Sequence, residues 1–190
     1  AKETINSMNP DIKVNVYKMR ISSENILGIV SEYDFVIDAT DNFPTKFLIN
    51  DACVKAKKPF CHAGILRFGG QLMTYVPGQG PCYRCIFQNP PPKDEVVTCK
   101  QAGIFGAVAG VVGSLQAMEA MKYILGMGEL LTGYLLIYDG LKMEFRKVKL
   151  PSDTSSCPVC GSGYVHESHT PSTPAEITFR GTNCQLRLRR

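Results

Sequence analysis

The residues with the clearest chemical potential are four cysteines in two Cys-x-x-Cys pairs, Cys82 with Cys85 and Cys157 with Cys160. Two residues between cysteines let both thiolates turn toward one point, and two such pairs supply the four sulfur ligands that tetrahedral zinc prefers. Because protein thiolates would fill every position, the predicted metal is structural rather than catalytic. The alternatives are two disulfides or a chance arrangement.

A second candidate site is the polar stretch Asp-Ala-Thr-Asp-Asn, which follows an apolar run typical of a buried parallel strand. Ligands of open α/β sheets bind at the carboxyl ends of the strands. The carboxylates of Asp38 and Asp41, with the oxygens of Thr40 and Asn42, could hold Mg²⁺ on a nucleotide phosphate. The alternative is that Thr40, Asp41 or Asn42 only caps the helix that Pro44 begins.

The third candidate is Cys99, which lies between a proline-rich stretch and a long apolar helix. A thiol near a helix N-terminus, with Lys100 beside it, is expected to be activated as a nucleophile. The alternative is an inert packed cysteine, the role expected for Cys53 and Cys61. His62 ends a buried strand and is predicted to be a core histidine rather than a catalyst.

The elements that must position these residues alternate along the first part of the chain. Helical patterns at 1–8, 26–30 and 44–57 each precede an apolar or alternating run that predicts a strand, at 13–17, 35–38 and 59–63. This order is typical of an α/β fold, with a Rossmann-like, mostly parallel sheet flanked by helices.

The rest of the chain predicts an antiparallel extension of that sheet. Strands are expected at 71–76, 134–138 and 143–150, and the four-cysteine zinc knuckle would fasten the extension. The prolines at 89–95 indicate an extended loop. The pattern at 103–125 predicts a long helix, nearly apolar all round and therefore buried.

Composition limits the function classes. With 190 residues, of which 44% are hydrophobic and 20% charged, the chain can form one domain with a substantial core. A net charge of +4 is too small and too dispersed to indicate a nucleic-acid partner. The most apolar stretch is short and interrupted by glycines, so no membrane span is predicted. The cysteine pairs favour metal in a reducing, cytoplasmic compartment.

The last part of the chain has a different composition. Ser, Thr, Pro and His dominate residues 162–190, which predicts a polar tail or linker, and residues 177–188 could add one strand. We therefore assign residues 1–161 to the folded domain.

Taken together, these segments resemble the carrier-protein-activating enzymes of thiamin and molybdopterin biosynthesis, which are relatives of the ubiquitin-activating enzymes. The resemblance covers residues 1–161. It rests on seven stretches in order: Asn9-Pro10-Asp11-Ile12, Asp38-Ala39-Thr40-Asp41-Asn42, Phe68-Gly69-Gly70-Gln71-Leu72, Cys82-Tyr83-Arg84-Cys85, Thr98-Cys99-Lys100-Gln101-Ala102-Gly103, Gly113-Ser114-Leu115-Gln116-Ala117-Met118-Glu119-Ala120 and Cys157-Pro158-Val159-Cys160-Gly161.

The resemblance implies a sulfur-carrier-protein adenylyltransferase. Such an enzyme uses Mg-ATP to adenylate the C-terminal Gly-Gly carboxylate of a ubiquitin-like sulfur carrier, and it releases pyrophosphate. By resemblance, Asp41 with Asn42 would serve the Mg-ATP site, and the loop 87–98 would cross over the carrier's tail. Cys99 would be the thiol of a later sulfur-transfer step. The four paired cysteines would hold structural zinc, and the enzyme would be a homodimer.

One departure from the family is plain. No G-x-G-x-x-G motif follows a strand and no P-loop is present, whereas the family's glycine loop and phosphate-gripping residues precede the segment that matches this chain. We therefore expect residues 1–161 to be the C-terminal two-thirds of an adenylation domain that cannot adenylate a carrier by itself. A rival hypothesis is a non-catalytic, zinc-clasped binding module for a carrier or partner subunit. A nicotinamide oxidoreductase is the weaker rival, because neither a dinucleotide fingerprint nor a catalytic base is visible.

Overall fold

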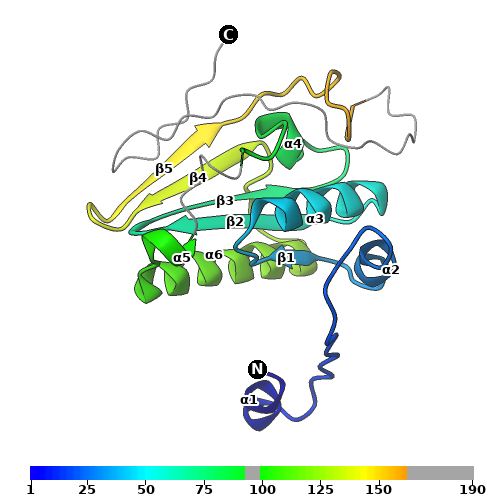
Figure 1. Ribbon diagram of the computed structural model, residues 1–190, viewed down its shortest axis with the longest axis vertical. Helices are drawn as coiled ribbons and strands as arrows, with labels where there is room; N and C mark the ends of the chain where they lie inside the picture. Colours follow the sequence, from blue (N-terminus) through cyan, green and yellow to red (C-terminus); the bar gives the residue numbers. More distant parts are fainter. Residues whose placement is uncertain (93–98, 162–190) are drawn as a thin grey trace.

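The computed structural model describes residues 1–92 and 99–161 (Figure 1). A sheet runs through the molecule, with α3 on one face and α6 on the other, while α1 stands apart at the end of an extended segment. In chain order the elements are α1 (Lys2–Met8), α2 (Ile26–Ser31), β1 (Val36–Asp38), α3 (Phe43–Lys55), β2 (Phe60–Leu66), β3 (Gly69–Tyr75), α4 (Tyr83–Ile86), α5 (Cys99–Ala102), α6 (Gly106–Leu125), β4 (Tyr134–Asp139) and β5 (Glu144–Lys149).

The parallel part of the sheet is the unit β1–α3–β2. Strands β1 and β2 pair in parallel, and the register places Asp38 beside His62. Helix α3 begins where Asn42 caps it, since the Asn42 side chain accepts a hydrogen bond from the backbone N–H of Thr45 at 3.0 Å. The predicted strand–helix–strand order is confirmed here, and the carboxyl end of β1 lies beside the third residue of β2, which continues to Leu66.

The sheet continues in antiparallel fashion in the order β1-β2-β3-β4-β5. A tight hairpin joins β2 to β3 at Arg67, whose φ of 53° lies in the left-handed region. The predicted antiparallel extension is confirmed. The described sheet is mixed rather than mostly parallel, because only the β1–β2 pairing is parallel and the three pairings that follow are antiparallel.

Each face of the sheet carries its own core. The face covered by α2 and α3 gathers aromatic residues, among them Phe47, Phe60 and Tyr83. The opposite face, covered by α6, is built from smaller side chains such as Cys61 and Val112. Neighbouring residues of β2 belong to different cores because successive side chains of a strand point to opposite faces.

Gly70 lets α6 approach the sheet closely. A Cβ at Gly70 would lie 2.5 Å from the Cγ2 atom of Val112, which is fully buried on α6. A helix needs such a contact to sit flat on a strand, so the glycine in β3 fixes the distance between sheet and helix.

Two predictions about elements need correction. Residues 13–17 form no strand, because the segment is largely exposed and pairs with no strand in the described chain. Helix α6 begins at Gly106 rather than Gly103, since Gly103 has φ 76° and its carbonyl accepts from the Arg67 N–H at 3.1 Å. That bond belongs to a bridge between the hairpin and the segment before the helix.

Helix α6 is also less buried than its composition predicts. Its buried positions are Val108, Val112, Gln116 and Glu119, which form one stripe facing the sheet. Its outer face exposes large apolar side chains: Met118, Met121, Ile124 and Leu125. An apolar pattern all round therefore does not mean burial within one chain.

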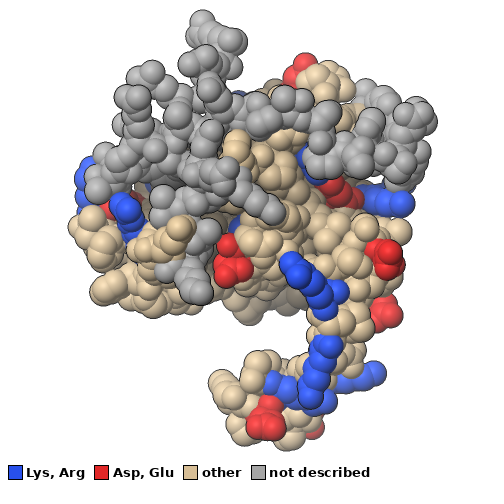
Figure 2. Space-filling model, viewed as in Figure 1, with Lys and Arg blue, Asp and Glu red and all other residues tan. Residues whose placement is uncertain are grey.

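No helix in the described parts of the chain is long and apolar enough to cross a membrane. On the face shown in Figure 2, basic and acidic side chains are scattered over the described surface, including the N-terminal segment, and they do not merge into one patch of a single sign.

Candidate metal centre and active site

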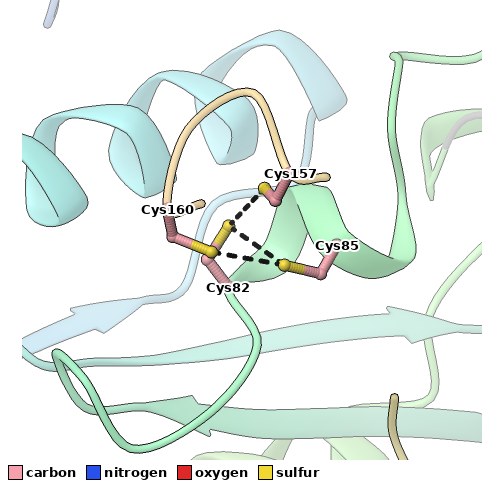
Figure 3. Close-up of side chains that lie close together, drawn as sticks. All are labelled: Cys82, Cys85, Cys157 and Cys160. Carbon is pink, nitrogen blue, oxygen red and sulfur yellow. Dashed lines mark hydrogen bonds between the residues drawn. The ribbon is translucent and has the colours of Figure 1, made fainter. Parts of the chain in front are cut away.

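The four paired cysteines come together at one point. Cys82 immediately precedes α4 and Cys85 lies within it, whereas Cys157 and Cys160 lie on a turn that follows β5. The four sulfur atoms lie within 4.8 Å of one another, and Figure 3 shows the side chains converging from the two segments. The structure thus assembles the complete set that the spacing predicted.

The sulfur–sulfur distances fit a metal site. They are 3.7 Å for Cys82 to Cys157, 3.9 Å for Cys85 to Cys82 and 3.3 Å for Cys85 to Cys160. Tetrahedral zinc with Zn–S bonds of about 2.3 Å places its sulfurs roughly 3.8 Å apart. A disulfide would bring two sulfurs to about 2.05 Å, and all four thiols are free. The arrangement therefore suits one four-coordinate ion and not the disulfide alternative.

Local backbone geometry shapes each cysteine pair. In the first pair, the N–H of Cys85 donates to the carbonyl of Cys82 at 3.1 Å. In the second pair, the N–H of Gly161 donates to the carbonyl of Cys157 at 3.1 Å, and a Cβ at Gly161 would lie 2.5 Å from that oxygen. The glycine after the second pair is thus required by the tightness of the turn.

The first cysteine pair is attached to α3 by side chains. The backbone N–H of Tyr83 donates to the Asn50 Oδ1 atom at 2.9 Å inside the core. The Arg84 guanidinium contacts the Asp51 carboxylate through two hydrogen bonds, and its Nη1 donates to the carbonyl of Gln88 at 3.1 Å. The candidate metal centre, α3 and the beginning of the loop after α4 are therefore linked by direct hydrogen bonds.

A buried ionic cluster lies where β1 ends beside the early part of β2. The Asp38 Oδ2 atom is 2.9 Å from His62 Nδ1 and 3.2 Å from Lys46 Nζ. Its Oδ1 atom accepts from the backbone N–H of Thr40 at 2.9 Å and from the Thr40 hydroxyl at 2.7 Å. Lys46 also donates to the Ala63 carbonyl at 2.6 Å. Asp38 and His62 are each 1% exposed, so water does not compete for these bonds.

The electrostatics of the cluster keep Asp38 ionised. Burial alone would raise the pKa of Asp38, but the hydrogen bond from His62 and the charge of Lys46 outweigh it and hold the pKa at about 2. Burial lowers the pKa of His62, and the hydrogen bond to Asp38 offsets only part of this effect. The cluster at neutral pH therefore contains one anion, one cation and a neutral imidazole.

The two aspartates of the predicted magnesium site, Asp38 and Asp41, have different environments. Both carboxylate oxygens of Asp38 accept hydrogen bonds from the protein, so Asp38 is not available to bind Mg²⁺. The hypothesis that the carboxylates of both Asp38 and Asp41 bind the ion therefore does not hold for Asp38. Asp41 is exposed at the strand end, two residues before α3. The helix-cap alternative applies to Asn42, whose Oδ1 caps α3, while its amide lies 3.5 Å from Asp41 Oδ1.

The remaining cysteines separate by environment. Cys53 and Cys61 are fully buried, and burial raises the pKa of each thiol to about 12, so both are packed and inert as predicted. Cys99 begins α5, a helix of four residues, and its side chain lies outside the described part. Residues 93–98 of the predicted crossover loop also lie outside it, as does the polar tail 162–190 with its predicted strand.

Sequence reasoning missed Lys46 and undervalued His62. His62 was correctly predicted to be a core histidine, but its bond to Asp38 depends on the register of two strands. The available signal was that Asp38 ends one apolar run and His62 lies early in the next, which forms the parallel neighbour. The prediction that His62 ends its strand is wrong, because β2 continues to Leu66. Lys46 carries no such signal, because a lysine eight residues after Asp38 is usually solvated.

The fold and the two sites define a Rossmann-like α/β domain with a strand-end carboxylate and a four-cysteine clasp. The chain belongs to the ThiF family, whose model matches residues 1–159. The family resemblance inferred from the motifs is thereby confirmed.

Named relatives share most of this chain. A sulfur carrier protein adenylyltransferase of Thermus thermophilus is 46% identical over 166 residues, which cover 85% of this chain and 61% of the relative. The adenylyltransferase and sulfurtransferase MOCS3 of Culex quinquefasciatus is 44% identical over 160 residues, covering 84% of this chain and 36% of the relative. The chain thus spans between about one third and three fifths of these relatives' lengths.

Solved structures support the fold. E. coli MccB has a TM-score of 0.70 at 21% identity, with 90% of this chain and 52% of that chain covered. E. coli MccB with MccA-N7isoASN has a TM-score of 0.69 at 23% identity, with 85% of this chain and 50% of that chain covered. At these identities the likeness concerns the fold.

Proposed function

We propose that this chain belongs to an enzyme that uses Mg-ATP to adenylate the C-terminal Gly-Gly carboxylate of a ubiquitin-like sulfur-carrier protein. The observation that carries the proposal is 46% identity to a sulfur carrier protein adenylyltransferase across 85% of the chain. The strand end adds chemical support, because it leaves Asp41 exposed where open α/β sheets bind their ligands.

The proposed reaction is one displacement at phosphorus. A carboxylate oxygen of the carrier forms a bond to the α-phosphorus of ATP, the bond from that phosphorus to the bridging oxygen breaks, and pyrophosphate leaves. Magnesium would neutralise phosphate charge, and Asp41 is the residue proposed to hold it. The protein's own contribution at this edge is to present one carboxylate in a fixed place while Asn42 caps α3.

We propose that the four-cysteine centre holds zinc and that this zinc is structural. Four thiolates complete a tetrahedron, so water has no position at the metal. The centre is linked to α3 by Arg84, and the same side chain binds the carbonyl of Gln88 at the start of the loop. Zinc at this place would fix the beginning of the loop 87–98, which we propose crosses over the carrier's tail. Cys99, at the start of α5, is proposed as the thiol of a later sulfur-transfer step.

We further propose a homodimer in the cytoplasm. The apolar outer face of α6 supports self-association, because Met118, Met121, Ile124 and Leu125 are each more than half exposed in the single chain. Free thiols at the metal centre support a reducing compartment. Sedimentation velocity tests the first point: Met121→Lys should shift a dimer to a monomer, whereas a monomeric unmodified chain would refute it.

A chimera tests the activity. Residues 1–159 of this chain replace the matching region of the Thermus thermophilus relative, and ATP–pyrophosphate exchange is measured with a carrier ending in Gly-Gly. Exchange should depend on the carrier, and Asp41→Asn should lower it by roughly two orders of magnitude. Asp34→Asn, an exposed carboxylate at the amino end of β1, is the matched control and should have little effect. A folded, zinc-loaded chimera without carrier-dependent exchange would instead favour the non-catalytic binding module.

A further inference from the structure

We propose that His62 is a positioning residue for Asp41, acting as a neutral hydrogen-bond donor that holds Asp38 and, through it, the loop that presents Asp41. The inference rests on the proposed function, since that function gives Asp41 a metal to bind. His62 itself touches neither the metal nor the substrates, and its effect passes through the Asp38 carboxylate.

His62 is the hydrogen-bond donor to Asp38. An ionised carboxylate only accepts hydrogen bonds, and Asp38 is ionised because Lys46 and His62 both face it. The proton between Asp38 and His62 must therefore sit on His62 Nδ1, which leaves Nε2 without a proton in the neutral ring. The Nε2 atom is buried and has no hydrogen-bond partner among the described residues. His62 is thus committed to one tautomer, and its hydrogen bond among the described residues is the one to Asp38.

The His62 ring is held in one orientation by its neighbours. His62 lies against the ring of Tyr83, with 4.3 Å between the centroids, and Tyr83 is fully buried in the first cysteine pair. From the opposite side of the sheet, the Gln116 amide donates to the backbone carbonyls of Asp38 and Cys61 at 2.9 and 3.0 Å. The end of β1 and the neighbouring part of β2 are therefore fixed before the loop begins.

Asp38 in turn anchors the loop that contains Asp41. Asp38 Oδ1 binds both the backbone and the hydroxyl of Thr40, so the residue before Asp41 is anchored. The residue after Asp41 is Asn42, which is anchored as the cap of α3. Asp41 is the exposed residue between two fixed neighbours, and its backbone has little freedom to turn its carboxylate elsewhere.

The charge balance explains why a neutral donor suits this place. Asp38 already has a full counter-charge in Lys46, which is 7% exposed. A second cation beside it would leave an excess positive charge in a buried site, where charge is costly. A neutral imidazole adds a hydrogen bond to Asp38 Oδ2 without adding charge, so the carboxylate keeps its second oxygen turned toward Thr40.

The first test needs no substitution. Nitrogen-15 NMR of the imidazoles in the 190-residue, zinc-loaded chain should show His62 with a protonated Nδ1 and an unprotonated Nε2 at neutral pH. A proton on Nε2 instead would mean that His62 does not donate to Asp38, and that result would overturn the inference.

The second test uses three variants of the same chain. His62→Leu removes the donor, whereas His62→Asn can place an amide donor near the position of Nδ1. Thr74→Val is the matched control, because the buried Thr74 hydroxyl donates to the Glu119 carboxylate at 2.6 Å, away from Asp38. In His62→Leu the amide of Thr40 should exchange with solvent roughly tenfold faster, while His62→Asn and Thr74→Val should stay close to the unmodified chain.

The metal arm uses Mn²⁺ with ATP as the probe. Paramagnetic broadening at the amides of Asp41 and Asn42 should require a roughly threefold higher Mn²⁺ concentration in His62→Leu, with recovery in His62→Asn. Unchanged Thr40 exchange and unchanged broadening in a folded His62→Leu chain would overturn the positioning role. If His62→Leu does not fold, amide exchange at Thr40 is compared between His62→Asn and the unmodified chain. Faster exchange in His62→Asn, which retains an amide donor, would contradict the inference.

The two proposals fail in different ways. Absence of broadening at Asp41 in the unmodified chain would remove the proposed metal role of Asp41. Faster Thr40 exchange in His62→Leu would still show that His62 holds the loop, because that measurement contains no metal.

Discussion

Arg84 and Asp51 form a two-bond ion pair between the first cysteine pair and α3, with distances of 2.6 Å from Nε to Oδ1 and 2.7 Å from Nη2 to Oδ2. The guanidinium also lies over the ring of Phe47, 4.8 Å from its centroid. A lysine cannot reproduce this planar, paired contact. The arginine between the two cysteines therefore links the metal centre to the helix that begins at the proposed active site.

This ion pair should be measurable by a double-mutant cycle. Arg84→Lys and Asp51→Asn should each lower the free energy of unfolding, and the coupling energy between them should be about 1 kcal/mol, since the pair is partly exposed. Urea denaturation of the four zinc-loaded proteins gives the number. Additive effects of the two substitutions would show that the contact contributes no net stability.

Zinc content should depend on each of the four cysteines and on no other described cysteine. Cys82→Ser should abolish stoichiometric zinc, because one ligand of a closed set is lost, and the protein should become strongly destabilised. Cys53→Ala is the control, since Cys53 is fully buried in α3 and outside the cluster. Metal analysis of the purified proteins decides, and one equivalent of zinc retained by Cys82→Ser would contradict the assignment.

Two glycine substitutions should change the free energy of unfolding in opposite directions. Gly70→Ala should destabilise the protein by about 2 kcal/mol, because the added methyl would overlap Val112 and force α6 off the sheet. Gly28→Ala should stabilise it by about 0.5 kcal/mol, since Gly28 is exposed in α2 and a Cβ there meets nothing. Thermal and urea unfolding of both variants test the pair. A neutral Gly70→Ala would show that the helix can shift freely.

Acid should remove the contribution of Asp38 to stability. The pKa of Asp38 is lowered to about 2 in the folded protein, against about 3.9 in an unfolded chain. The stabilisation is therefore fully present above about pH 4 and is lost as the pH falls toward 2. Asp38→Asn should cost about 2 kcal/mol at neutral pH, and the difference from the unmodified protein should shrink between pH 4 and 2. A difference independent of pH in denaturant titrations would exclude this carboxylate as the cause.

Sequence reasoning succeeded where the determinants are local. The spacing within each cysteine pair fixes how two thiolates point, and the alternation of apolar and helical patterns around Phe43 fixes the strand–helix–strand unit. The same reasoning failed for residues 13–17. A segment with an alternating pattern forms a strand only when a neighbouring strand pairs with it, and the sequence does not show whether one does. The prediction that α6 is buried all round also failed. Apolar composition does not show which side of a helix packs against the sheet and which side is left exposed.

The division of labour between Asp38 and Asp41 could not be predicted from the sequence. Both are aspartates in one short polar stretch, and their difference arises from Lys46 on α3 and His62 on β2. These contacts depend on strand register and on the turn of a helix, which local patterns do not specify. The same limit explains why His62 was recognised as buried but not as a hydrogen-bond donor.

The cysteine clasp has a consequence for how the chain is made. Cys82 and Cys85 leave the ribosome about seventy residues before Cys157 and Cys160, so a nascent chain holds half a metal site while α6, β4 and β5 are still being synthesised. The centre can close only after α6, β4 and β5 have been synthesised. Metal uptake would then follow the synthesis of the sheet's last two strands, so the bound ion would join a segment made early to one made late.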